Sequence, residues 1–249
     1  MISTNDFIFG CGVVGSRISN NNFSLLFDKI IDLNISKFDN SYIYGKGLAE
    51  KYLNEQVKKK NLKIFSTIKF GRELNFNLST ILVNIFRLEM ANLARIFFET
   101  KYNYNLNDIK KFVKRYDNFT NIKFNTFFFH DPKFLLKSFL TKEIIFFLKK
   151  KFKQIGCANP DYKDLKYICE SKYFNVIQLN VIDYLKNKEY LITNFKGEIW
   201  VNQIIKFSRT NKIDWFKFCF DQKKKSSNLK FVLGIKNVEI INRLKKELA

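Results

Sequence analysis

The chain has 249 residues, of which 46% are hydrophobic, and its 44 Lys and Arg residues against 23 Asp and Glu give a formal net charge of +21. A chain of this length can bury a substantial single core, and its two prolines and nine glycines form no linker, so we expect one domain over residues 1–249. No apolar run approaches the roughly 18 residues that a membrane-spanning helix needs, and the amino terminus lacks the cationic start and apolar core of a signal peptide. We therefore expect a cytoplasmic protein without a membrane span.

The positive charge would attract phosphates, acidic membrane surfaces or nucleic acid. However, the chain is rich in Lys, Asn, Ile and Phe together, the residues that A/T-rich codons specify, and a bias in base composition explains much of the excess. The basic runs 58–60, 149–151 and 223–225 lie at the ends of predicted elements, without a recognisable nucleic-acid-binding module. No specific nucleic-acid partner is expected, and these lysines are interpreted as a solvated face.

The four cysteines, Cys11, Cys157, Cys169 and Cys219, have no C-x-x-C spacing, and the chain contains a single histidine that could join them. This pattern indicates neither a zinc site nor a disulfide framework. Reduced thiols in a cytoplasm fit it best, and no metal is expected.

Short apolar runs alternate with amphipathic helical stretches along the whole chain. The runs predict strands at 36–39, 64–69, 124–130, 154–159, 175–180, 199–203 and 230–235. The helical stretches are 23–33, 48–58, 106–116, 135–152, 161–170 and 238–248. Such alternation is typical of parallel strands joined by crossover helices.

Seven strands of this kind can form an open doubly wound sheet, or an eight-stranded (β/α)8 barrel whose missing strand lies in the poorly patterned stretch 207–228. Polar residues distinguish the two, because a barrel draws its catalytic groups from the carboxyl ends of several strands, whereas an open sheet concentrates them at one switch point. Here Asp39, Lys69, His130, Asn159 and Gln178 stand at that end of five successive strands. The sequence therefore predicts the barrel.

A glycine run near the amino terminus raises a competing interpretation. Gly10, Gly12 and Gly15 follow an apolar run with the G-x-G-x-x-G spacing of a dinucleotide-binding turn. The polar run 19–22 interrupts the helix that such a turn requires, and no acidic residue follows at a clear strand end. We expect instead a glycine-bearing hairpin that closes the floor of the barrel.

The segment 38–53 carries the most specific pattern. Asp39 follows a hydrophobic residue, the pair Tyr44-Gly45 comes five residues later, and Glu50 and Leu53 lie in the predicted helix beyond. This arrangement resembles the aldo-keto reductase family. The resemblance continues in order through 66–69, 125–132, 156–159, Gln178 and 232–237, and it spans nearly the whole chain from residue 7 to 248.

The resemblance implies reduction of a carbonyl by hydride transfer, with a small aldehyde, ketone or sugar as substrate. Charge that develops on the carbonyl oxygen must be met by a proton, and a tyrosine can supply it when a lysine ammonium lowers its pKa from about 10. Asp39 would hold Lys69, Lys69 would polarise Tyr44, and Tyr44 would act as the general acid. His130, which alone would be interpreted as a hydrogen-bonded core histidine, would orient the substrate.

The same resemblance implies a nicotinamide cofactor. Asn159 and Gln178 would bind its carboxamide, and Gly234 and Lys236 would approach the adenosine phosphate. Because the Lys236 ammonium is a point charge suited to an extra phosphate, NADP(H) is expected over NAD(H).

Four positions depart from the family pattern. Ala158 replaces a serine that contacts the nicotinamide, Asn54 replaces a helix glycine, and Leu244 stands where an adenine-facing asparagine is common. At Asn202 the family often places a tyrosine or arginine beside the nicotinamide, so stacking there would be lost. These departures keep open an alternative, namely a barrel that binds nucleotide or protein without turnover.

Overall fold

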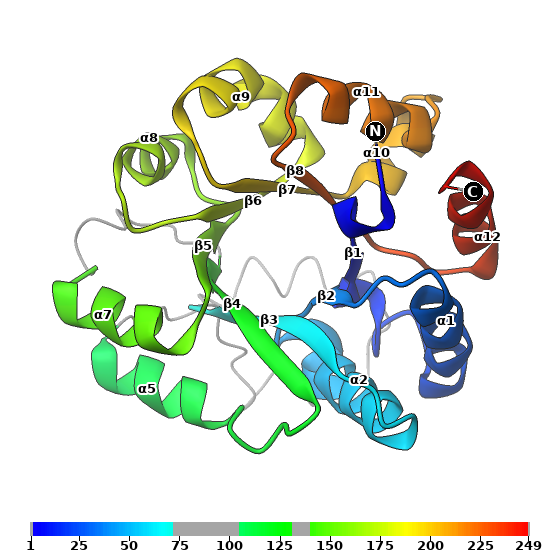
Figure 1. Ribbon diagram of the computed structural model, residues 1–249, viewed down its shortest axis with the longest axis horizontal. Helices are drawn as coiled ribbons and strands as arrows, with labels where there is room; N and C mark the ends of the chain where they lie inside the picture. The colour runs from blue at the N-terminus through cyan, green and yellow to red at the C-terminus, as the bar shows by residue number, and fades with distance from the viewer. Residues whose placement is uncertain (1, 72–104, 131–139, 249) are drawn as a thin grey trace, which may run out of the picture.

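The computed structural model describes residues 2–71, 105–130 and 140–248. Eight parallel strands pair in chain order, and the last pairs with the first to close a barrel, as Figure 1 shows. Phe9 of the first strand pairs with Leu233 of the last, and this pairing closes the barrel. The strands are β1 (Phe7–Gly10), β2 (Lys37–Asp39), β3 (Ile64–Phe70), β4 (Ile122–His130), β5 (Gln154–Ala158), β6 (Val176–Asn180), β7 (Glu198–Asn202) and β8 (Leu229–Leu233). The (β/α)8 prediction is confirmed.

Helices surround the barrel on all sides and run antiparallel to the strands (Figure 1). The described helices are α1 (Asn20–Asp32), α2 (Leu48–Lys59), α5 (Leu106–Lys114), α7 (Lys142–Lys151), α8 (Tyr162–Glu170), α9 (Val181–Asn194), α10 (Ile204–Thr210), α11 (Trp215–Lys225) and α12 (Val238–Leu248). Helices that follow a strand therefore begin at the mouth of the barrel, and helices that precede a strand finish at its floor, whereas α10 leads into α11. No helix in this part of the chain is long and apolar enough to cross a bilayer.

Short polar side chains fix where several helices begin. Asn105, Thr141, Asp161, Asn180 and Asp214 each accept a hydrogen bond from a backbone N–H in the first turn of the helix that follows. Such caps satisfy donors that have no partner inside the helix. Local sequence thus sets the length of each connection at the mouth.

The eighth strand differs from the expectation. It is β1, whose four residues are all buried, and not a strand within 207–228, which instead contains the end of α10 and all of α11. The expected floor hairpin at 7–15 was therefore wrong as well, because Phe7–Gly10 pairs in parallel with β2 and β8 and the 3-10 helix η2 (Cys11–Val13) follows it. Four residues are too few to show a strand period.

Several helices also differ from the sequence expectation. The run 19–22 does not delay a helix, because Ser19 caps α1, which begins at Asn20. Helices α9 and α10 were not predicted, and both begin at once after a strand. The expected helix 135–152 begins only at Lys142 among the described residues, and its predicted start at 135–139 lies outside them.

Two buried clusters make up the core. Ile8, Phe128, Ala158, Val176, Trp200 and Val232 lie together as the smaller cluster. The larger cluster contains the apolar faces of the helices, such as Ile109, Phe112 and Val113 of α5, together with the outward side chains of the strands. The polar residues discussed below lie at the carboxyl ends of the strands.

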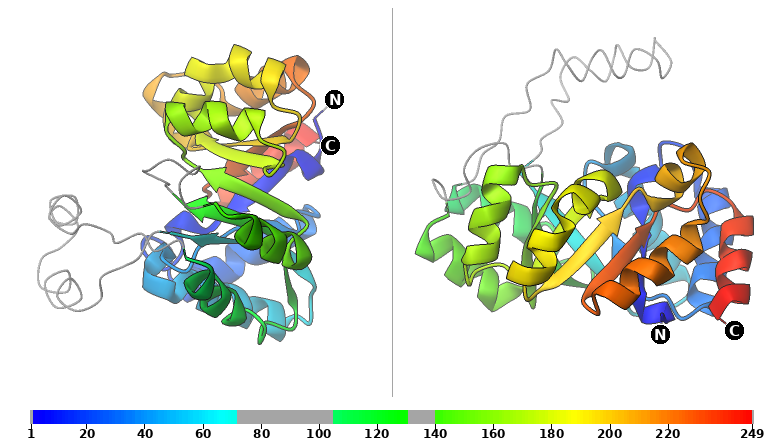
Figure 2. Two further views of the ribbon diagram at one scale, coloured as in Figure 1. Left: turned by 90° about the vertical axis from the view of Figure 1, so that its left-hand side faces the viewer. Right: turned by 90° about the horizontal axis from the view of Figure 1, so that it is seen from above.

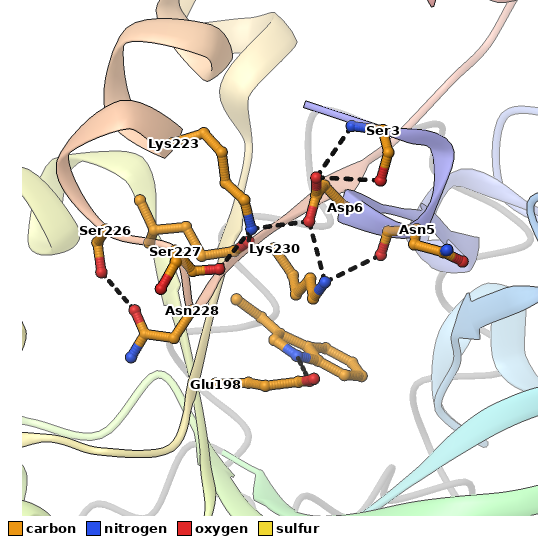
Figure 3. A network of polar contacts seen from close by, with 11 residues as sticks. Ser3, Asn5, Asp6, Glu198, Lys223, Ser226, Ser227, Asn228 and Lys230 are labelled. Atoms are coloured by element: carbon orange, nitrogen blue, oxygen red, sulfur yellow. Dashed lines mark hydrogen bonds and ion pairs between the residues drawn. The ribbon is translucent and has the colours of Figure 1, made fainter. Parts of the chain in front are cut away.

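A polar network ties the amino-terminal segment to the floor of the barrel (Figure 3). The carboxylate of Asp6, in the 3-10 helix η1 (Thr4–Asp6), lies 2.7 Å from the ammonium of Lys223 and 3.0 Å from that of Lys230. Burial alone would raise the pKa of Asp6, but the hydrogen bonds from the two lysines more than offset it, so this pKa lies below its ordinary value. The network closes the end of the barrel opposite the mouth.

Candidate active site

A fully buried lysine lies at the centre of the barrel mouth. Lys69, near the end of β3, is 1% exposed. Its ammonium lies 2.9 and 3.0 Å from the two carboxylate oxygens of Asp39 and donates to the phenol oxygen of Tyr44 at 3.0 Å. A buried ammonium needs such partners, because an unpaired charge in the interior is strongly unfavourable.

The charges around Lys69 keep it protonated. Burial would lower the pKa of its ammonium, but the nearby Asp39 carboxylate and then the Tyr44 oxygen raise it, and the net pKa lies above the usual lysine value. The same ammonium lies 3.0 Å from the phenol oxygen of Tyr44, where a fixed cation favours negative charge on that oxygen. Tyr44 is thereby suited to acid–base chemistry.

The loop between β2 and α2 carries Tyr44. It forms the 3-10 helix η3 (Tyr44–Gly47), in which Gly45, Lys46 and Gly47 all have left-handed backbone angles. The Tyr44 N–H donates to the Ser41 carbonyl at 2.9 Å, which fixes the turn. These contacts turn the chain back over the mouth and direct the phenol toward Lys69.

Thr67 supports Asp39, although the sequence did not single it out as a site residue. Its hydroxyl accepts from the N–H of Asn40 at 2.8 Å, donates to the carbonyl of Asn40 at 2.8 Å, and lies 3.4 Å from the Asp39 carboxylate. The end of β2 is thereby held against β3. A threonine two residues before the lysine on a strand gives no sequence signal of this role, because it lies 27 residues from its partner.

His130 ends β4 and completes the group at the mouth. It is 4% exposed, and its ring lies edge-on to the ring of Tyr44 with centroids 6.3 Å apart. Asp39, Tyr44, Lys69 and His130 thus converge from the ends of β2, β3 and β4 and the loop after β2.

Gln178 and Asn159 lie beside this group. The side-chain oxygen of Gln178 accepts from the Lys69 ammonium at 2.6 Å, and the N–H of Asn159 donates to the Gln178 carbonyl at 2.8 Å. Gln178 is fully buried, yet its amide nitrogen has no hydrogen-bond partner within the described ranges. A buried donor without a partner at the mouth of a barrel marks a position for a ligand acceptor.

Cations gather beyond the end of β8. Burial, and then Arg17 and Arg209, lower the pKa of Lys236. A Cβ atom at Gly234 would meet no atom within 4 Å, so this loop faces open space. Arg17 and Arg209 were missed by the sequence analysis, because they come from the loop after β1 and from α10. The electrostatic effect of Arg17 and Arg209 on Lys236 shows that this loop is positive, and positive potential favours an anionic group.

Solved structures of known proteins share this architecture, whereas no protein-family model and no curated protein sequence matches the chain. The holo aldo-keto reductase AKR11C1 from Bacillus halodurans superposes with a TM-score of 0.71 at 12% identity, over 96% of this chain and 84% of that one. An aldo-keto reductase from Klebsiella pneumoniae in complex with NADP and acetate superposes with a TM-score of 0.62 at 10% identity, over 98% of this chain and 85% of that one. The thermostable aldo-keto reductase Tm1743 gives a TM-score of 0.60 at 14% identity, over 98% and 89%.

This chain has the aldo-keto reductase fold. The resemblance seen in the sequence is therefore confirmed for the fold, and the tetrad Asp39, Tyr44, Lys69 and His130 lies at the carboxyl ends of its strands. At these identities the activity has to be argued from the site itself.

The structure places the departures from the aldo-keto reductase pattern at different depths. Leu244, on α12, is fully buried in the core, and Ala158 is fully buried within the barrel. Asn202 ends β7, paired in register with Asn180, and its buried side-chain oxygen has no hydrogen-bond partner in the described part of the chain. Asn54 lies half-buried on α2. No cluster of metal ligands occurs over the described ranges.

Proposed function

We propose that this aldo-keto reductase barrel reduces a carbonyl group to an alcohol with NADPH. The observation that carries the proposal is the contact of 3.0 Å between the Lys69 ammonium and the Tyr44 hydroxyl, within a buried ion pair to Asp39. A structural ion pair would need only Lys69 and Asp39. The phenol at the open side of the pair is what gives the site a proton to transfer.

Each of the four side chains has a separate role in the proposed reaction. Asp39 holds Lys69 charged and in place, and Lys69 stabilises the phenolate that forms when Tyr44 gives its proton to the carbonyl oxygen. His130, whose ring lies against that of Tyr44, donates a hydrogen bond that orients the substrate oxygen. The bound nicotinamide supplies the hydride, and the protein supplies position and charge stabilisation.

The residues present fit a nicotinamide cofactor. The unsatisfied amide nitrogen of Gln178 would donate to the carboxamide oxygen, and Asn159, held against Gln178, would support the same group. Gly234 would leave room for the adenosine phosphate, and Lys236 with Arg17 and Arg209 would hold the extra phosphate of NADP. The departures at Ala158 and Asn202 remove two further contacts, so we expect weaker cofactor binding than a complete set would give.

Small aldehydes, ketones and sugars are the substrates we propose. Free cysteines, of which Cys11, Cys157 and Cys219 are buried, fit a reducing compartment, and a cytoplasmic location is part of the proposal. The observation that favours a second function, nucleotide or protein binding without turnover, is the set of changes at Ala158, Asn202 and Leu244, which would impair turnover while the barrel itself is kept.

The test is consumption of NADPH by the purified protein with a panel of aldehydes. Replacement Tyr44→Phe should lower kcat by about 10² to 10⁴ while NADPH still binds, because only the proton donor is lost. Tyr52→Phe, on α2 away from the tetrad, serves as the matched control and should leave kcat unchanged. Full activity in Tyr44→Phe would refute the mechanism, whereas NADPH binding without turnover of any carbonyl would establish the second function.

A further inference from the structure

Lysines gather at the floor of the barrel, at the carboxyl ends of several of the described helices. Helices run from mouth to floor, and their first turns hold acidic residues such as Glu50 in α2 and Glu143 in α7. Their last turns hold lysines, with two in α2 and three each in α7 and α11. In the right panel of Figure 2 these last turns lie at the floor, where both chain ends also lie. The floor is therefore basic and lies opposite the active site.

Helix stability explains only part of this distribution. A cation near a helix carboxyl terminus interacts favourably with the helix dipole, so lysines in last turns are expected in any helix. Lys63, Lys153, Lys172 and Lys196 lie in connections just before strands, and Lys123 is the second residue of β4. All five are exposed at the floor and lie outside any helix. A biased composition adds lysines but does not select one face.

The basic residues are densest where β3, β4 and β5 begin, and these strands are neighbours in the barrel. Residues 58–60 with Lys63 precede β3, Lys111 and Lys114 precede β4, and residues 149–151 with Lys153 precede β5. Asp117 is the single acidic residue of the three connections 60–63, 115–121 and 152–153, which all lie in the described ranges. Lys60 is paired with Asp28 of α1 at 2.6 Å, and the other lysines of this group are exposed, where solvent or an anionic partner can meet their charge.

Aromatic side chains are exposed beside these lysines. Phe65, at the start of β3, is 37% exposed. Phe146 of α7 is 61% exposed, and the Lys150 ammonium lies 4.1 Å from the centre of its ring. Lysine with exposed aromatic rings on one face is typical of surfaces that meet the headgroup region of a bilayer.

We propose that the β3–β5 sector of the floor docks on the surface of an anionic phospholipid bilayer. The basic connections form turns around the end of a closed barrel, so a planar anionic surface can meet all three lysine runs at once. Lysines dominate the sector, and lysine acts as a point charge that needs no base-specific geometry. Docking by this face leaves the mouth, with Tyr44 and Lys69, open to solvent.

The test is cosedimentation of the full chain with vesicles of phosphatidylcholine alone or with added phosphatidylglycerol, at increasing salt. We expect binding to the anionic vesicles that weakens as salt rises, and none to the neutral ones. The triple variant K149Q/K150Q/K151Q should weaken partitioning by about a hundredfold, since each lysine near an anionic surface contributes about fivefold.

A matched control removes the same charge from the opposite face. The variant K142Q/K163Q/K186Q changes exposed lysines in the mouth-side turns of α7, α8 and α9, and its partitioning should stay near that of the unaltered protein. Equal losses in the two variants would show that net charge alone drives binding and would overturn the proposal. So would a failure to bind anionic vesicles, or tighter binding to RNA or duplex DNA that the floor variant abolishes. Circular dichroism melting confirms that both variants are folded, and reductase activity is not needed for any outcome.

Discussion

Gly15 and Gly45 pack backbone against backbone and join the loop after β1 to the loop that carries Tyr44. Both have left-handed backbone angles, with φ of 77° and 54°. A Cβ atom at Gly15 would lie 2.5 Å from the Cβ of Leu48 and 3.2 Å from the Cα of Gly45. The glycine run 10–15, which matches a dinucleotide fingerprint in the sequence, thus supports the catalytic loop of a barrel.

The substitution Gly15→Ala should destabilise the protein and displace Tyr44. A side chain there requires an unfavourable left-handed angle and pushes on the loop 45–48, so we expect a loss of about 1–3 kcal/mol in the free energy of unfolding. Thermal melting and kcat for carbonyl reduction measure the two effects. Gly12→Ala is the control, since its Cβ would make an ordinary contact of 3.8 Å with the Tyr44 ring. Similar behaviour of the two variants would contradict a special role of the Gly15–Gly45 contact.

Removing the charge of Lys69 and removing the charge of Asp39 should shift the pH profile of reduction in opposite directions. Reduction needs protonated Tyr44, so the rate falls as pH rises through the pKa of that phenol. Lys69→Met removes the cation that favours the phenolate, raises the pKa and moves this limb to higher pH by about one unit or more, whereas Asp39→Asn moves it to lower pH. The measurement is kcat against pH.

The double variant Lys69→Met with Asp39→Asn controls for the unpaired carboxylate that the first replacement leaves buried. Since both charges are gone, its alkaline limb should lie between those of the single variants. Limbs that move in the same direction in both single variants would show that Tyr44 is not the titrating group.

His130 should matter for the substrate and not for the cofactor. Its ring lies against Tyr44, whereas Gln178, which we propose contacts the cofactor, lies against Lys69. We expect His130→Ala to lower kcat/KM by about 10- to 100-fold, the worth of one hydrogen bond to developing charge, with the Kd for NADPH unchanged. Steady-state kinetics and calorimetric titration separate the two quantities. A parallel rise in the NADPH Kd would place His130 in the cofactor site instead.

Replacement of Gln178, in contrast, should affect binding of the cofactor. The replacement Gln178→Leu removes a buried donor that has no partner among the described residues, and we expect a Kd for NADPH raised about tenfold. Quenching of tryptophan fluorescence on NADPH addition measures it. Gln178 also accepts from Lys69, so the pH profile serves as a second measurement. An unchanged Kd would remove Gln178 from the proposed cofactor contacts.

Asp6 should stabilise the floor of the barrel above acidic pH. Its pKa is lowered in the folded state, so its contribution is present above the ordinary pKa of about 3.9 and is lost as pH falls through the folded value. Asp6→Asn should therefore lower the free energy of unfolding by about 1–3 kcal/mol at neutral pH, and by less at acidic pH. Denaturant unfolding at several pH values tests this expectation. Asp117→Asn, an exposed acid of another floor connection, should have little effect at any pH.

The sequence by itself determined the alternation of strands and helices, most of the strands, and the places of Asp39, Tyr44, Lys69 and His130 along them. Hydrophobic period and capping residues are local, so seven of the eight strands could be read along the chain, and polar residues at or near the ends of five of them mark the mouth. Asp39, Lys69 and His130 were found in this way, and Tyr44 through the motif around it. Local patterns failed at β1, because four buried residues show no period.

Only the tertiary structure decided what these residues meet. Lys69 and Gln178 are 109 residues apart, yet 2.6 Å separates their polar atoms, because closing the barrel brings distant strands together. Thr67 supports Asp39, Arg17 and Arg209 approach Lys236, and Gly15 contacts Gly45 for the same reason. The lysine runs 58–60, 149–151 and 223–225, which are far apart in the sequence, all lie toward the floor because α2, α7 and α11 each end just before a strand begins. These contacts join residues that are distant in the sequence, so they form only when the barrel closes.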